Sequence, residues 1–306
     1  MRGFLATFFV LASGVIALSV SVVGRAAQPR AEARELCVRE TPHFSLSHTL
    51  PDGDAADLSQ LLETLYARCF TACQDAGLRS RVPREPLHWL CVTQGEATRL
   101  CAGCRAGDMP SSEEAYYSAH TNTVVLLHPG ASPAGGNLDG MSPIRTDVWR
   151  ISHELAHQML FNTGVQTRGV LYPVWLSEGL AANFETHDPA GGGFAEDNAS
   201  RRCRLTAAYR QNRLLSLNEI ITFPRPPAEE EACLDFYAQA WGMVHFLYRR
   251  DPKAFRLYLC TLAMRSPGAR PAAALRREFD HIFGSPADIQ RDWENYLSRA
   301  EPVSGS

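Results

Sequence analysis

Two histidines and a glutamate form the pattern with the most specific chemistry in this sequence. His153, Glu154 and His157 stand in the order H-E-x-x-H. Each helical residue turns by about 100°, so the two histidines lie about 40° apart on one helix face. This spacing lets two imidazole nitrogens reach one Zn²⁺ at about 2.0–2.1 Å. The intervening glutamate can then take a proton from a metal-activated water, which is the chemistry of metal-dependent hydrolysis.

A catalytic zinc site needs a third protein ligand, and Glu178 is the candidate. It stands in the segment WLSEGLA at 175–181, and Pro173 just before this segment favours a helix start. The span 162–173 contains two glycines that let the chain reverse, so the second helix can lie against the first. The predicted zinc ligands are therefore His153, His157 and Glu178, with Glu154 as the general base.

An amphipathic helix is expected to carry the H-E-x-x-H segment over residues 144–162. Its apolar residues recur at spacings of three and four, so they form one stripe that holds the helix in the core. The two imidazoles point roughly opposite that stripe, toward a cleft. The stripe consists of Ile144, Val148, Ile151, Leu155 and Met159.

H-E-x-x-H followed by W-L-x-E-G-x-A resembles the gluzincin clan of zinc metallopeptidases. More narrowly, it is similar to the peptidase MA-like proteins of exported bacterial chains, as is the distal segment YAQAWGMVHFL at 237–247. The resemblance covers roughly residues 40–300 and is specific over about 140–250. It implies a zincin-like α+β fold with a small mixed α/β upper lobe, an active-site helix and a mostly helical C-terminal lobe.

The same resemblance suggests a donor for the developing oxyanion. Gluzincins often use a tyrosine or histidine from the lower lobe, which makes Tyr237 the first candidate and His245 the second. Tyr237 shares a predicted helix face with Trp241, Val244 and Tyr248, so a packing role stays open. His245 can equally be a buried histidine with its hydrogen bonds satisfied.

One position departs from the thermolysin branch of the clan. There, an acidic residue one turn after the glutamate ligand supports a zinc-bound histidine, whereas this chain has Ala182. Asn183, Asp147 and Glu185 are the candidates to replace that acid.

The N-terminus is typical of an exported protein. Arg2 precedes an uncharged apolar run from 4 to 23, and small residues follow. Residues 1–27 are therefore predicted to be a signal peptide or, because the run is long, an uncleaved N-terminal anchor. The nine cysteines agree with an oxidising compartment and predict disulfides whose pairing stays open. We expect a secreted or periplasmic location, with membrane contact only through such an anchor.

Composition limits the classes of partner. The 306 residues include 30 basic and 33 acidic side chains, giving a formal net charge of −3. Without a basic excess to contact phosphates, nucleic acid is not expected as a partner. A peptide or protein substrate is expected instead, and the oligomeric state is left open.

The remaining pattern predicts two parts, an N-terminal α/β lobe at 28–140 and a zincin-like catalytic and helical lobe at 141–300. A Pro- and Gly-rich segment at 129–143 separates them. The expected strands are 43–47, 87–93 and 123–128, with a helix at 54–76. Residues 116–128 are expected to supply an edge strand for substrate backbone. The further helices expected are 174–185, 201–212, 235–249, 252–264, 270–280 and 286–299.

The leading hypothesis is an extracytoplasmic zinc-dependent peptidase. Two alternatives remain open on the sequence alone. One is a non-catalytic binding or scaffold module of zincin fold, which the absent supporting acid would suit. The other is a zinc hydrolase of a non-peptide amide, which the same three ligands would serve.

Overall fold

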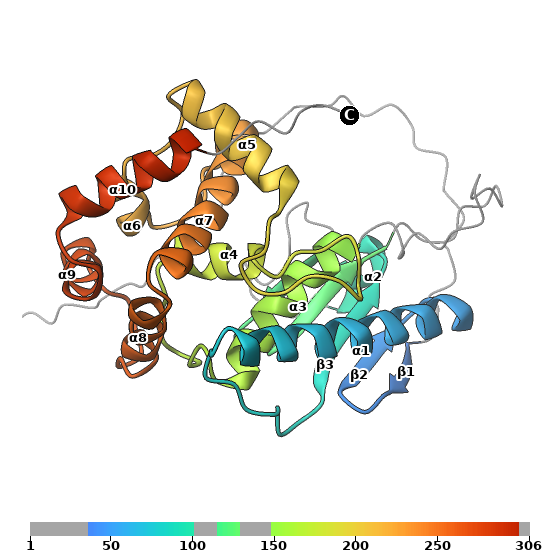
Figure 1. Cartoon of the computed structure of the whole chain (residues 1–306). Helices are drawn as coiled ribbons and strands as arrows, with labels where there is room; N and C mark the ends of the chain where they lie inside the picture. Colours follow the sequence, from blue (N-terminus) through green and yellow to red (C-terminus); the bar gives the residue numbers. More distant parts are fainter. Residues whose placement is uncertain (1–35, 101–114, 129–147, 300–306) are drawn as a thin grey trace, which may run out of the picture.

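The computed structural model describes residues 36–100, 115–128 and 148–299 (Figure 1). The predicted signal peptide or anchor and the predicted boundary near residue 140 lie outside these ranges. Within them, every helix is too short or too polar to cross a lipid bilayer.

A five-stranded mixed sheet forms the first part of the chain. Its order is β1-β2-β3-β5-β4, and the central pairs β2–β3 and β3–β5 are parallel while both outer pairs are antiparallel. Among the described strands, β4 is therefore an edge. The strands are β1 Cys37–Glu40, β2 Phe44–His48, β3 Leu87–Val92, β4 Ala115–Ser118 and β5 Thr123–Leu127.

Two helices contact the sheet and one another, and Figure 1 shows the long helix α1 running along it. They are α1 Asp52–Asp75 and α3 Val148–Thr163. Buried and less buried side chains alternate along the strands, as expected for a sheet with one face covered by helices. Phe44, Leu46 and Trp89 are buried, whereas Ser45 is half-buried. The short helix α2, Gln94–Leu100, follows β3 directly.

Gln158 fastens α3 to the sheet through polar contacts inside this core. Its side chain is fully buried, and its amide oxygen accepts a hydrogen bond from the Trp89 indole nitrogen at 2.9 Å. Its amide nitrogen donates to the backbone carbonyls of His88, at 3.1 Å, and Asn122, at 3.0 Å. The register of α3 over β3 and β5 is therefore fixed by directional bonds as well as by apolar packing.

Replacing Gln158 with leucine is expected to lower the free energy of unfolding by about 1–3 kcal/mol. The leucine would leave the buried Trp89 N–H without its partner and would remove the bonds to the two backbone carbonyls. Urea titration followed by tryptophan fluorescence measures the change. Gln60→Leu is the matched control, since Gln60 is exposed on α1. Equal stability of the two variants would contradict this role for Gln158.

The other described helices lie beside the sheet, where Figure 1 shows them in yellow-green to red. The most extensive helix–helix contact is between α4 and α7, and α5 also packs on α7. Trp175 of α4 stacks on Tyr258 of α8, with ring centroids 6.4 Å apart. The helices are α4 Val174–Ala182, α5 Ala199–Arg210, α6 Leu217–Thr222, α7 Glu230–Arg250, α8 Pro252–Ala263, α9 Ala272–Phe283 and α10 Pro286–Arg299.

The molecule is thus of the α+β class, as the sequence predicted. Helix α3 contacts the sheet, α1 and also α4, so it packs against both predicted lobes. The single edge strand expected over 116–128 is a hairpin instead. Asn122, with a positive φ of 58°, lies in the turn between β4 and β5, and only β4 reaches the edge.

No disulfide joins two cysteines within the described ranges. Cys69 and Cys73 lie one turn apart on α1, both buried, and both carry free thiols. The predicted disulfides therefore remain a prediction, and Cys101 and Cys104 lie outside the described residues.

Candidate metal centre

Three side chains from α3 and α4 converge on one point. The Nε2 atoms of His153 and His157 are 3.2 Å apart, and each lies 3.4 Å from Oε2 of Glu178. The side chains are 10%, 12% and 19% exposed, so the cluster is nearly buried but still reachable from solvent. The structure therefore brings together the three residues that the sequence singled out as ligands.

Local sequence explains this convergence. The α3 stripe of Val148, Ile151, Leu155 and Met159 is buried, which turns the two histidines toward α4. After α3 the chain bends at Gly164 and Gly169, whose φ values of 87° and 82° favour glycine. Pro173 then caps the start of α4.

The donor set fits a metal ion. Ligands held tetrahedrally at about 2.0–2.1 Å from one ion stand about 3.3 Å from one another. The three separations of 3.2, 3.4 and 3.4 Å match that value. Two imidazole nitrogens and one carboxylate oxygen also leave a fourth position open. His153, His157 and Glu178 would hold the ion.

Electrostatics at the cluster favours a cation between its members. Burial alone would lower the pKa of His153, but hydrogen bonds with Glu178 and Glu185 raise this pKa to about 10. Burial alone would raise the pKa of Glu178, but the charge of His157 and hydrogen bonds from both histidines hold this pKa well below its usual range. Both shifts have the same origin, the close approach of carboxylates to the imidazoles.

Glu154, the predicted general base, is half-buried beside the cluster. Burial raises the pKa of its carboxyl group, while the charges of His153 and His157 and a backbone hydrogen bond from Tyr117 act in the opposite direction. Tyr117 lies on β4, so the glutamate faces the edge strand of the sheet. A carboxylate of raised pKa is a better proton acceptor than an exposed one.

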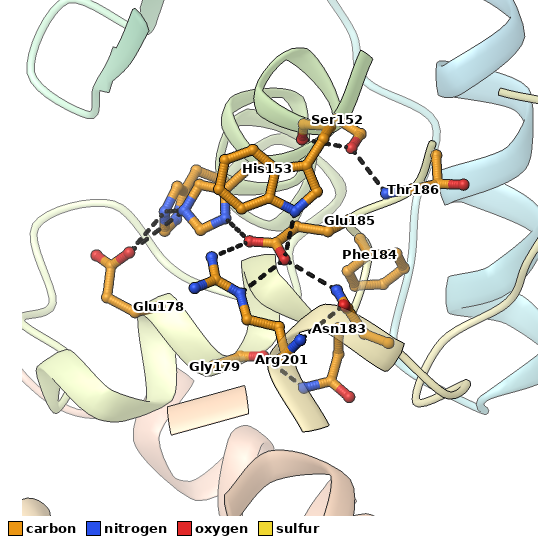
Figure 2. A network of polar contacts seen from close by, with 12 residues as sticks. Ser152, His153, Glu178, Gly179, Asn183, Phe184, Glu185, Thr186 and Arg201 are labelled. Atoms are coloured by element: carbon orange, nitrogen blue, oxygen red, sulfur yellow. Dashed lines mark hydrogen bonds and ion pairs between the residues drawn. The ribbon is translucent and has the colours of Figure 1, made fainter. Parts of the chain in front are cut away.

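Glu185 supplies the supporting acid that Ala182 cannot. Its carboxylate is fully buried and accepts a hydrogen bond from Nδ1 of His153 at 2.8 Å. Figure 2 shows this carboxylate lying between His153 and Arg201. A proton on Nδ1 leaves the lone pair of Nε2 directed at the metal position. Burial opposes ionisation, yet hydrogen bonds from His153 and Arg201 lower the pKa of Glu185 to about 2.

The other two candidates for this role are not in that position. Asn183 donates from its amide nitrogen to the backbone carbonyls of Gly179, at 2.6 Å, and Trp241, at 3.0 Å, so it joins α4 to α7. Asp147 lies outside the described residues.

The two oxyanion-donor candidates occupy different surroundings. The Tyr237 ring on α7 is half-buried and meets the His153 ring edge-on, with centroids 6.2 Å apart. His245 instead accepts or donates a hydrogen bond at Nδ1 to the Tyr296 hydroxyl of α10, at 2.9 Å, and packs on Trp241. Burial and the charge of Arg249 lower the pKa of His245 to about 4. The structure therefore places Tyr237, and not His245, in ring contact with the cluster.

Sequence reasoning missed the residues that bind Glu185 beside His153. Trp149 precedes His153 by one helical turn, and its indole N–H donates to Glu185 at 2.9 Å. Its spacing of four residues before His153 was an available signal. Arg201 comes from α5 and binds both oxygens of Glu185, and nothing in its spacing marks it.

A family model described as "Protein of unknown function (DUF1570)" matches residues 147–269. This range spans α3 to α8 and includes the three clustered residues, Glu154, Glu185 and Tyr237. No curated protein is significantly similar to the chain.

Proposed function

We propose that this protein is a zinc-dependent peptidase that acts outside the cytoplasm, cleaving peptide bonds of a peptide or protein substrate. The observation that carries the proposal is the convergence of His153, His157 and Glu178 with tetrahedral spacing beside Glu154. A purely structural metal site has no need of a neighbouring base. The resemblance to gluzincins supports the same reading, and the extracytoplasmic location rests on the N-terminal sequence.

The chain's own residues have separable tasks in this reaction. When bound, a zinc ion would supply Lewis-acid polarisation of the scissile carbonyl and lower the pKa of a water. Glu154 accepts the proton of the attacking water and delivers it to the leaving amine nitrogen, so one peptide and one water give a carboxylate and an amine. Tyr237 is our candidate donor to the oxyanion. Glu185 holds the His153 ring in one orientation and tautomer.

The presence of Glu185 weakens the argument for a non-catalytic module. That alternative was favoured by the absence of an acid at position 182, but Glu185 accepts the hydrogen bond from His153 in place of such an acid. No observation on the described residues favours a non-peptide amide over a peptide, so peptide hydrolysis stays the leading function.

A diverse peptide mixture tests the proposal. We expect the zinc-loaded protein to generate new peptide termini, detected by mass spectrometry. Chelation should abolish the cleavage and added Zn²⁺ should restore it, since the ion is needed for the reaction. His157→Asn should behave like the chelated protein, whereas His187→Asn, at an exposed histidine, should behave like the wild type. A demonstrably zinc-loaded sample that produces no new termini would reject peptide hydrolysis.

A further inference from the structure

Glu185 is held from several directions at once. Oε1 accepts from His153 at 2.8 Å and from Nη2 of Arg201 at 2.6 Å. Oε2 accepts from Trp149 at 2.9 Å, from Asn198 at 3.1 Å and from Nε of Arg201 at 2.9 Å. Because the carboxylate has no exposed surface, it needs a paired cation to remain ionised. Arg201 provides it through two parallel bonds (Figure 2).

The same guanidinium also contacts two aromatic rings. It lies 5.0 Å from the ring centroid of Trp149 and 5.5 Å from that of Tyr237. Both separations are within the range of cation–π attraction. The Arg201 side chain is only 9% exposed, so little water competes for it. Arg201 therefore contacts both Glu185, which supports the predicted ligand His153, and the ring of Tyr237, the candidate oxyanion donor.

We propose that Arg201 is a positioning residue that sets two groups of the site together: through Glu185 it orients His153, and through its face it orients Tyr237. The inference rests on the proposed function for its catalytic consequence, while its effect on metal affinity is independent of any substrate. It also assigns a task to α5, since Arg201 joins this helix to α3 and α7.

The geometry requires an arginine at this position. A planar fork can bond both oxygens of Glu185 while its face lies against the aromatic rings. A lysine at position 201 would keep a positive charge near Glu185, but it would lose one of the two parallel bonds and the stacked plane. Arg201→Lys therefore removes the orientation while leaving the buried carboxylate with a counter-charge.

Zinc affinity, measured by competition with a chromophoric chelator, is the first readout for Arg201→Lys in the full protein. We expect affinity to fall by about 10- to 100-fold, the usual effect of losing the support of a metal ligand. Arg202→Lys is the matched control, because Arg202 is the next residue on α5 and binds the exposed Asp197. It should bind zinc like the wild type.

Kinetics of peptide cleavage with saturating zinc give the second readout. We expect Arg201→Lys to lower kcat with little change in KM, since it displaces reacting groups and does not touch substrate. Tyr237→Phe should then lower kcat much less in the Arg201→Lys background than in the wild type, because Arg201→Lys has already displaced the Tyr237 hydroxyl.

Several outcomes would overturn the inference. Lower thermal stability with unchanged zinc affinity and kcat would reduce Arg201 to a structural ion pair. If the effects of Arg201→Lys and Tyr237→Phe on kcat were additive, Arg201 would not orient Tyr237. If Arg201→Lys does not fold, Glu185→Gln must show the same loss of zinc affinity, and normal affinity there rejects the proposal. A wild type that binds no zinc rejects the proposed function itself, which is a distinct result.

Discussion

Glu154→Gln is expected to lower the rate of peptide cleavage by about 10²- to 10⁴-fold while leaving zinc bound. Glutamine has nearly the same shape as glutamate, so the packing beside Leu155 and Tyr117 is kept. Its amide cannot accept the proton of the attacking water. The candidate metal position is formed by His153, His157 and Glu178, none of which changes. The measurement is the initial rate on the best peptide found in the mixture, with zinc content determined on the same sample.

The control for this variant removes an equal charge elsewhere. Glu294 is exposed on α10, and Glu294→Gln should keep full activity. If Glu154→Gln retained more than a tenth of the wild-type rate with zinc bound, Glu154 would not be the base. Loss of zinc together with activity would instead indicate that Glu154 shapes the metal position.

Short-range patterns were sufficient to predict which three residues converge and which helices carry them. The two histidines and the apolar stripe of α3 belong to one helix, so their relative directions follow from helix geometry. Glu178 was predicted because a helix start and two glycines allow the chain to turn back. The long helix α1, expected at 54–76, was equally clear, since its buried residues recur at helical spacing.

Contacts between distant segments were less predictable. Arg201 comes from another helix, and only the tertiary arrangement brings its guanidinium to Glu185, the carboxylate that binds His153. The short elements β1, α2 and α6 were not predicted, because a few residues carry little periodicity. The helix expected at 235–249 begins earlier, because α7 starts at Glu230 with Glu229 as its N-cap. Glu229 accepts hydrogen bonds from two backbone N–H groups there, and negative charge is favourable at a helix start.

The contact between α4 and α7 connects the cluster of His153, His157 and Glu178 to the helical part of the molecule. Glu178 and Gly179 are neighbours on α4, and Gly179 faces α7 where Tyr237 also lies. A Cβ atom at position 179 would stand 2.3 Å from the carbonyl oxygen of Ala240 and 2.7 Å from a Val244 methyl group. The glycine therefore allows the two helix backbones to approach closely, and with them Glu178 and Tyr237.

Gly179→Ala is expected to lower the free energy of unfolding by about 3 kcal/mol or more, at or above the upper end of overpacking costs. The clash is with backbone, which cannot rotate away, so α4 must separate from α7. Zinc affinity should fall as well, because Glu178 moves with α4. Chemical denaturation of the chelated protein measures the first effect, and chelator competition measures the second.

Two other glycines make this prediction specific. Gly53 lies in the first turn of α1, where a Cβ atom would have no neighbour within 4 Å, so Gly53→Ala should be neutral or slightly stabilising. At Gly242 the nearest atom is the end of the Leu205 side chain, which can change rotamer, so Gly242→Ala should cost less than Gly179→Ala. The order of cost is thus expected to be 179, then 242, then 53. A Gly179→Ala protein as stable as Gly53→Ala would show that α4 and α7 do not pack this closely, and the placement of Glu178 against the two histidines would lose its support.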